Sequence, residues 1–196
     1  LSCLSSLHSS VSFLDSSAFS FSRSTATCRF QAISRPDALD LLNGSWILAA
    51  GDSQSRLLVL SLISLLLGDD PAALAPARDA LFRRHSDYQI QIPRRAIRLD
   101  FLWSPFEPNI SSSLRSLNHR PDVLVAGSGL WHMLHVSNAT DYGRGLAEIK
   151  KAMEATEAEI SSHAFWLGMP ALVEEMLNTE EKRARMNATA REGYER

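Results

Sequence analysis

The sequence predicts an α/β fold, a three-layer sandwich with a central, mostly parallel sheet. Three observations predict it. Short apolar runs typical of strands alternate along the chain with longer runs that have helical character. The run 123–126 contains no polar residue, as expected of a parallel strand that helices cover on both faces. The length of 196 residues, with 45% hydrophobic and 21% charged residues, is enough for a single core.

The first half of the predicted domain follows from hydrophobic patterning and from breaks. We predict helices over 36–42, 55–67 and 73–85, and strands over 46–50, 88–92 and 97–101. The break Gly68-Asp-Asp-Pro71 separates two of the helices. Apolar and polar residues alternate in the runs 88–92 and 97–101, so each is expected to be a strand with one solvated face.

The second half contains a loop, a long helix and a polar end. We predict helices over 110–117 and 142–162, strands over 123–126 and 164–167, and a final helix that opens at Thr179. Prolines at 105 and 108 indicate a loop before the first of these helices. Leu146, Ile149 and Met153 share one face of the long helix. Thr179 is the expected N-cap of the last helix, because acidic residues follow it.

The segment 1–34 differs in composition from the rest. It is rich in serine and contains Asp15 as its one acidic residue, so we expect a disordered head, followed by the α/β domain over 35–196. Such a head is typical of a stem that links a membrane anchor to a domain, and equally of an organelle transit peptide. Cys3 and Cys28 are either bonded to each other or free.

Charge and spacing argue against several classes of partner. The net charge is −2 and no basic patch with interleaved aromatic residues occurs, so no nucleic-acid partner is expected. The longest apolar run, 57–67, is too short to span a bilayer, so membrane contact is expected only through an anchor outside this chain. No metal site is expected, because three histidines lack ligand spacing: His85, His119 and His163.

Acceptor sequences for N-glycosylation are more numerous than chance predicts. Four of the six asparagines lie in such sequences: Asn43, Asn109, Asn138 and Asn187. About one or two would be expected from the serine and threonine content. We therefore predict a secretory-pathway lumen such as the Golgi, with a plastid as the alternative. Asn138 and Asn109 are the best candidates, since both fall in predicted loops.

A serine lies at a predicted strand-to-helix turn. The strand that starts at Trp46 ends in Gly51-Asp52-Ser53, and a helix-like run follows at once. The N–H groups at a helix start lack intrahelical partners and can hold a developing oxyanion. The alternative is that Asp52 or Ser53 only caps the helix. The strand 123–126 likewise ends in small residues, Gly127-Ser-Gly129, so two strand ends are expected to face one cleft.

These motifs resemble the SGNH/GDSL hydrolase superfamily. Within it, the chain is similar to PC-esterases, trichome-birefringence-like polysaccharide O-acetyltransferases and the luminal domain of sialate O-acetyltransferase. The resemblance covers 28–196 and rests on Gly51-Asp52-Ser53 with Arg56, on the run Phe101-Leu-Trp-Ser-Pro-Phe106, and on Gly129-Leu-Trp131. It implies that Ser53 is the nucleophile and that a downstream Asp-x-x-His supplies the rest of a triad.

The chain departs from that family pattern at two points. No aspartate is followed three residues later by histidine, so the resemblance implies a fragment that ends before this motif and has little activity alone. Esterases of the superfamily outside the acetyltransferase branch carry an asparagine near the second strand end, where this chain has Ser128, Gly129 and Leu130. That difference fits the acetyltransferase branch.

The predicted chemistry is acyl transfer through an ester on Ser53, with water or a sugar hydroxyl as acceptor. The N–H groups of Ser53 and Gly129 are the expected oxyanion donors. Arg56 would bind an anionic or carbonyl group, or else pair with Asp52 or lie in solvent. His132 is a conceivable base, although most such histidines are structural.

Trp103 and Trp131 would stack on sugar, or else lie in the core. No bound cofactor is expected, and the acetyl donor is not identified. The predicted function is a serine-dependent O-acetyltransferase or esterase acting on glycans. The alternatives are a non-catalytic SGNH-like domain that binds a glycan or a partner, and a plastid ester hydrolase.

Overall fold

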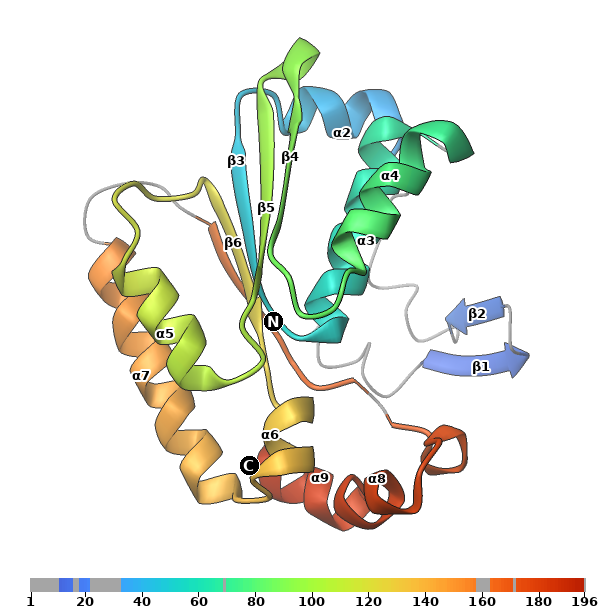
Figure 1. The fold of residues 1–196 in the computed structure, drawn as a ribbon, viewed down its shortest axis with the longest axis vertical. Coiled ribbons are helices and arrows are strands. Elements are labelled where there is room, and N and C mark those ends of the chain that lie inside the picture. The colour runs from blue at the N-terminus through green and yellow to red at the C-terminus, as the bar shows by residue number, and fades with distance from the viewer. Residues whose placement is uncertain are drawn as a thin grey trace. The chain divides into compact units, whose positions relative to one another are not determined.

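The computed structural model describes residues 11–15, 18–21, 33–68, 70–157, 163–170 and 172–195 (Figure 1). The chain divides into two compact units, 1–34 and 35–196. The first unit contains an antiparallel pair, β1 (Val11–Asp15) and β2 (Ala18–Phe21), which the sequence does not predict. Most of the segment for which we expect disorder lies outside the described residues, as do both cysteines.

The second unit is built on a five-stranded sheet with the order β4-β5-β3-β6-β7. Its strands are β3 (Trp46–Gly51), β4 (Tyr88–Ile92), β5 (Ile97–Trp103), β6 (Val123–Gly127) and β7 (His163–Leu167). Four of them are parallel, and β4 runs antiparallel to β5 at one edge. Each strand predicted for this unit is present, and the predicted mostly parallel sheet is confirmed.

Helices form a layer on each face of the sheet (Figure 1). One layer contains α2 (Arg35–Leu41), α3 (Ser53–Leu67) and α4 (Pro71–Leu81), and the other contains α5 (Glu107–Arg115) and α7 (Ala139–Glu157). Three short helices lie beyond the carboxyl ends of the parallel strands: α6 (Leu130–His135), α8 (Glu180–Arg185) and α9 (Ala188–Glu195). The described residues of this unit also form two 3-10 turns, η2 (Pro93–Arg95) and η3 (Glu174–Met176). The three-layer α/β sandwich is therefore confirmed.

Each face of the sheet has its own core. On one face, Ile47 and Ala49 of β3 pack with β5, α3 and α4. On the other face, Leu48 and Ala50 of β3 pack with β6, α5 and α7. Because successive side chains of a strand point to opposite faces, β3 is buried on both sides, which explains why its sequence is apolar throughout.

A third apolar cluster lies beyond the carboxyl edge of the sheet. Its buried members are Met133 of α6, Tyr142 of α7, Met186 at the end of α8 and Tyr194 of α9. The single polar helix predicted at the C-terminal end is in fact two helices, α8 and α9. Thr179 caps the first of them as predicted, since its hydroxyl accepts from the backbone N–H of Lys182 at 3.2 Å.

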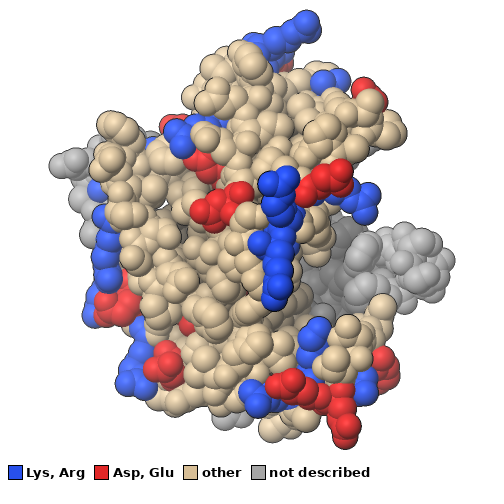
Figure 2. Space-filling model, viewed as in Figure 1, with Lys and Arg blue, Asp and Glu red and all other residues tan. Residues whose placement is uncertain are grey.

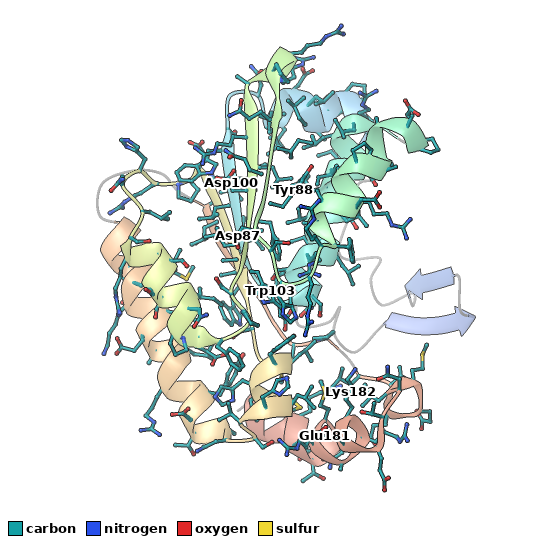
Figure 3. The ribbon with its side chains drawn as sticks, in the orientation of Figure 1. Asp87, Tyr88, Asp100, Trp103, Glu181 and Lys182 are labelled. Atoms are coloured by element: carbon teal, nitrogen blue, oxygen red, sulfur yellow. The ribbon has the colours of Figure 1, made fainter. Side chains whose placement is uncertain are left out.

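Local predictions are corrected at three places. The helix α5 begins at Glu107, inside the expected loop, because Pro108 falls in its first turn, where proline is tolerated. The helix α4 begins at Pro71, behind an Asp70 cap, and ends at Leu81. In β5, Asp100 is buried instead of solvated, because Arg98 pairs with it at 2.6 Å and Trp46 donates to it at 2.9 Å (Figure 3).

Two observations concern membranes and nucleic acids. None of the helices in the described part of the chain is long and apolar enough to cross a bilayer. Most of the face shown in Figure 2 carries no charged side chain, and in several places lysine or arginine side chains lie beside aspartate or glutamate side chains.

Candidate active site at the carboxyl edge of the sheet

Three strand ends meet at the carboxyl edge of the sheet. Gly51, the last residue of β3, pairs in register with Trp103 of β5 and with Gly127 of β6. The chain then continues from β5 with Ser104, whose N–H donates to the carbonyl oxygen of Gly51 at 2.9 Å. The two turns singled out in the sequence therefore lie side by side.

Close approach of the backbone requires glycine at two of these strand ends. A Cβ on Gly51 would overlap Ser55 Oγ and the carbonyl oxygen of Gly127. A Cβ on Gly127 would lie 2.7 Å from the Cβ of Leu167. A side chain at either position would force β3, β6 or β7 to move, so the glycines set the spacing of the strands at this edge.

Asp52 and Ser53 have different positions at the start of α3. Asp52 is the N-cap, and its buried Oδ1 accepts from the N–H of Gln54 at 2.9 Å. Burial raises the pKa of the Asp52 carboxyl, and its backbone hydrogen bonds and the charge of Arg56 offset this only in part. Ser53 is the first residue of the helix and is exposed. Capping therefore occupies Asp52 and leaves the hydroxyl of Ser53 at the surface.

Gln54 connects the start of α3 to the segment after β7. Its side-chain Nε2 donates to the carbonyl oxygen of Gly168 at 3.3 Å. In the same segment, Met169 fills the space that a Cβ on Gly129 would need, with Sδ 2.6 Å from that position. The backbone of Gly129 has φ of +123°, which disfavours any residue with a side chain.

Glu107 and Tyr142 fix the second strand end from the opposite helical layer. The buried Ser128 hydroxyl donates to Glu107 Oε1 at 2.6 Å. Tyr142 donates its phenolic O–H to the carbonyl oxygen of Ser128 at 3.2 Å. Burial, together with the nearby carboxylates, raises the pKa of Tyr142 to about 12. The turn that contains Gly129 is thus held by α5 and α7.

Arg56 is buried against aromatic rings near the same edge. Its guanidinium carbon lies 4.3 Å from the ring centroid of Trp103, and the rings of Phe82 and Phe101 lie 5.6 Å and 5.8 Å away. Among the described residues, no hydrogen bond uses Nε or Nη2 of Arg56. The expected solvent exposure of Arg56 is therefore wrong, whereas its charge does interact with that of Asp52. Burial lowers the pKa of this guanidinium, and the charge of Asp52 opposes that shift.

An aromatic cluster surrounds Trp131. It comprises His85, Trp103, Phe106, Trp131 and His135. Trp103 and Trp131 are partly buried and meet edge to face, with centroids 5.4 Å apart. Figure 3 shows Trp103 where β5 ends, at the lower side of the sheet. The backbone N–H of Trp103 donates to Asp87 Oδ1 at 2.8 Å. Both tryptophans therefore lie at the edge that contains Ser53, and Trp103 also packs against the first core, in part as the core alternative expects.

His132 is held by partners other than Ser53. Its buried ring has Nδ1 2.8 Å from the hydroxyl of Tyr194, and Nε2 lies 3.5 Å from Asp141 Oδ2 and 3.8 Å from Glu107 Oε2. In the described part of the chain, no hydrogen bond joins a histidine to Ser53. The same residues contain no group of three side chains suited to hold a metal ion.

Glu107 is the polar residue of this region that sequence reasoning missed. The local sequence does not signal its burial, because glutamate is almost never fully buried unless a partner pairs with it. Its partner Ser128 is 21 residues away, and nothing in the local pattern predicts that pairing.

The four glycosylation sequences lie at different kinds of position. Asn43 is exposed in the turn after α2. Asn109 is exposed in the first turn of α5, so its expected place in a loop is wrong. Asn138 is exposed before α7, and its side chain accepts from Asp141 N–H at 3.1 Å. Asn187 is partly buried and bonds to α8 and α9.

Sequence comparison relates the chain to a plant protein. It is 42% identical over 191 residues to Protein ALTERED XYLOGLUCAN 9 of Arabidopsis thaliana. The alignment covers 89% of this chain and 52% of the relative, so the chain spans about half the length of that protein. No family model and no solved structure matches the chain.

Proposed function

We propose that this chain carries the nucleophile of a serine-dependent O-acetyltransferase or esterase that acts on glycans. One observation carries the proposal. Ser53 is exposed as the first residue of α3, at the carboxyl edge of the sheet, while Asp52 supplies the cap. At such a position the free N–H groups and the helix dipole favour negative charge on a bound carbonyl oxygen.

In this proposal, Ser53 Oγ attacks the acyl carbonyl of the donor. A general base takes the hydroxyl proton of Ser53 and passes it to the donor's leaving group, and the acyl group remains on Ser53 as an ester. A sugar hydroxyl or water then attacks this ester and releases Ser53. The N–H groups of Ser53 and Gly129 hold the oxyanion, and Arg56 and Trp131 contact the substrate.

The attack by Ser53 requires a general base, and no histidine of the described residues bonds to Ser53. In the superfamily that the sequence resembles, an Asp-x-x-His supplies it. The alignment leaves about half of the relative unmatched. We assign the base to residues of the full-length protein outside these 196, and we propose a secretory-pathway lumen such as the Golgi as its compartment, with a plastid as the alternative.

The name of the Arabidopsis relative suggests the glycan to test first. It refers to xyloglucan, and we take xyloglucan oligosaccharides as the first acceptors. The identity of the acetyl donor stays open in this proposal, because no contact in the described residues selects one.

A non-catalytic domain that binds a glycan or a partner is the second candidate. One observation favours it: no histidine of the described residues bonds to Ser53. The two candidates differ in whether an acyl group is ever attached to Ser53.

The deciding experiment compares Ser53→Ala with Ser61→Ala in the full-length protein. Ser61 is also exposed on α3, and its hydroxyl bonds only to the Leu57 carbonyl one turn earlier. Acetyl transfer to xyloglucan oligosaccharides should fall on the order of a thousandfold or more in Ser53→Ala and stay unchanged in Ser61→Ala. The two variants should melt at the same temperature.

Mass spectrometry after a brief incubation with an acetyl donor should find one acetyl group on the peptide that contains Ser53. Full activity in Ser53→Ala would overturn the enzyme proposal. A wild-type protein that binds glycan but never acquires the acetyl group would establish the second candidate.

A further inference from the structure

A cavity of about 720 Å³ lies between α5 and the N-terminal half of α7, beside α6. Ser53 is not among the residues that line it. Its volume is in the range of sites that enclose a small organic ligand. The residues that determine its chemistry are Phe106, Glu107, His132, Val136, Asp141 and Arg144.

Two buried polar side chains in this cavity have unused hydrogen-bonding capacity. Glu107 and His132 are exposed by only 1% and 3%. Glu107 Oε1 accepts from Ser128, whereas in the described residues no hydrogen bond uses Oε2. Oε2 lies 3.8 Å from His132 Nε2, which is longer than an N–H···O hydrogen bond. A ligand group that bonds to both atoms would use this capacity and be stabilised here.

The charges around the cavity select against an anionic ligand. His132 Nε2 faces two carboxylates, Glu107 and Asp141. At the rim, Arg144 pairs with Asp141 at 3.1 Å, and Arg115 pairs with Glu148 at 2.9 Å, so each arginine is already neutralised. An anionic ligand would lie beside the Glu107 carboxylate, and the arginines at the rim would not balance its charge because they are already paired. Like charges in a site that contains little water repel each other.

The remaining surface suits the apolar faces of a sugar ring. Phe106 and Val136 contribute apolar surface, while the carboxylates accept from hydroxyls and Arg144 can donate. Phe106 also contacts Trp131, with ring centroids 6.2 Å apart. The cavity is therefore adjacent to the aromatic cluster at the edge that contains Ser53.

We propose that this cavity binds one neutral pyranose unit of a glycan, with its hydroxyls donating to Glu107 and accepting from His132. The ligand class rests on the proposed function, but the binding itself requires neither Ser53 nor turnover. The site would hold a sugar unit apart from the one whose hydroxyl reacts.

The test measures binding of cellotetraose and xylotetraose by calorimetry. The parent protein is the full-length protein with Ser53→Ala, and each further substitution is added to it. Glu107→Gln keeps an acceptor for Ser128 and removes the charge. Its dissociation constant should rise on the order of tenfold or more, because a hydrogen bond to a charged group is lost. Val136→Trp, at a side chain that is 45% exposed, should block the cavity without disturbing the core.

Lys150→Ala is the matched control. Lys150 is 76% exposed, lies on α7 and does not line the cavity. This variant should bind as the parent does. If Glu107→Gln does not fold, Val136→Trp alone decides the question.

Three results would overturn the proposal: a folded parent that binds neither probe, equal affinity in the parent and Val136→Trp, and displacement of the probes by acetyl phosphate. A parent that binds the probes with loss in Val136→Trp would support it, even if the wild-type protein proves to have no transferase activity. Failure of the Ser53 chemistry and failure of this site are thereby distinguishable.

Discussion

Two glycines of α7 allow a direct test of how closely α5 and α7 pack. A Cβ on Gly145 would lie 2.6 Å from the Cβ of Glu107 and 2.8 Å from its Cγ. Carbon atoms in contact are normally about 3.5–4.0 Å apart, so Gly145→Ala requires a displacement of roughly 1 Å between the helices. A Cβ on Gly143, in the same helix, would meet no atom within 4 Å.

The two substitutions share one effect and differ in the other. Each replaces glycine inside a helix, which stabilises by about 0.5–1 kcal/mol. Only Gly145→Ala also overpacks the contact with Glu107, which costs about 1–3 kcal/mol. We expect Gly143→Ala to be more stable than wild type, and Gly145→Ala to be less stable than Gly143→Ala by about 1–3 kcal/mol.

Urea unfolding followed by circular dichroism and tryptophan fluorescence measures both free energies. Because Glu107 also holds Ser128, Gly145→Ala should in addition weaken binding of the neutral oligosaccharides. Equal free energies of unfolding for the two variants would refute the packing argument, since they would show that the helices separate at no cost.

Three further predictions concern ionisation and glycosylation. Burial raises the pKa of Asp52 above its ordinary value of 3.8, so folding disfavours the charged form of this carboxyl. Asp52→Asn should therefore stabilise the protein at neutral pH but not below pH 3.8. Melting temperature measured against pH tests this. The pKa of Tyr142 is raised to about 12 from 10.0. The stability that depends on its neutral form is therefore lost as pH rises through that interval. In the same measurement, Tyr142→Phe should lose less stability at alkaline pH than the wild-type protein. Protein made through a secretory pathway should lose mass on N-glycan removal, and less so in Asn138→Gln or Asn109→Gln; import into plastids without glycans would contradict this.

The sheet was predictable because its signals are local. Gln89 and Gln91 alternate with apolar residues, and β4 exposes both glutamines. The apolar run of β3 predicts burial on both faces, which the two cores explain. By contrast, α6 spans only six residues and has too few turns for a hydrophobic period to be recognised. The burial of Asp100 depends on Trp46, which is 54 residues away in the sequence.

The candidate site was predictable only at its turns. Gly51-Asp52-Ser53 marks a strand end and a helix start within three residues, so the exposed Ser53 follows from local pattern. The contact of Arg56 with Trp103 depends on the register that pairs Gly51 with Trp103, which no local pattern fixes. The bond between His132 and Tyr194 joins residues 62 apart through the third apolar cluster.

Glu107 connects the proposed sugar cavity to the proposed oxyanion donor. One of its carboxylate oxygens bonds to Ser128, the residue before Gly129, and the other faces the cavity. A change at Glu107 therefore acts on both places, whereas the side chain of Val136 lines the cavity. In a full-length protein with transferase activity, Val136→Trp should raise KM for the glycan and leave kcat near wild type, because it removes binding common to ground state and transition state. Glu107→Ala should raise KM and also lower kcat, because Ser128 loses its hydrogen-bond acceptor and the N–H of Gly129 loses its fixed position. If both variants changed KM alone, Ser128 would not transmit the position of Glu107 to the oxyanion donor, and Glu107 would act in sugar binding only.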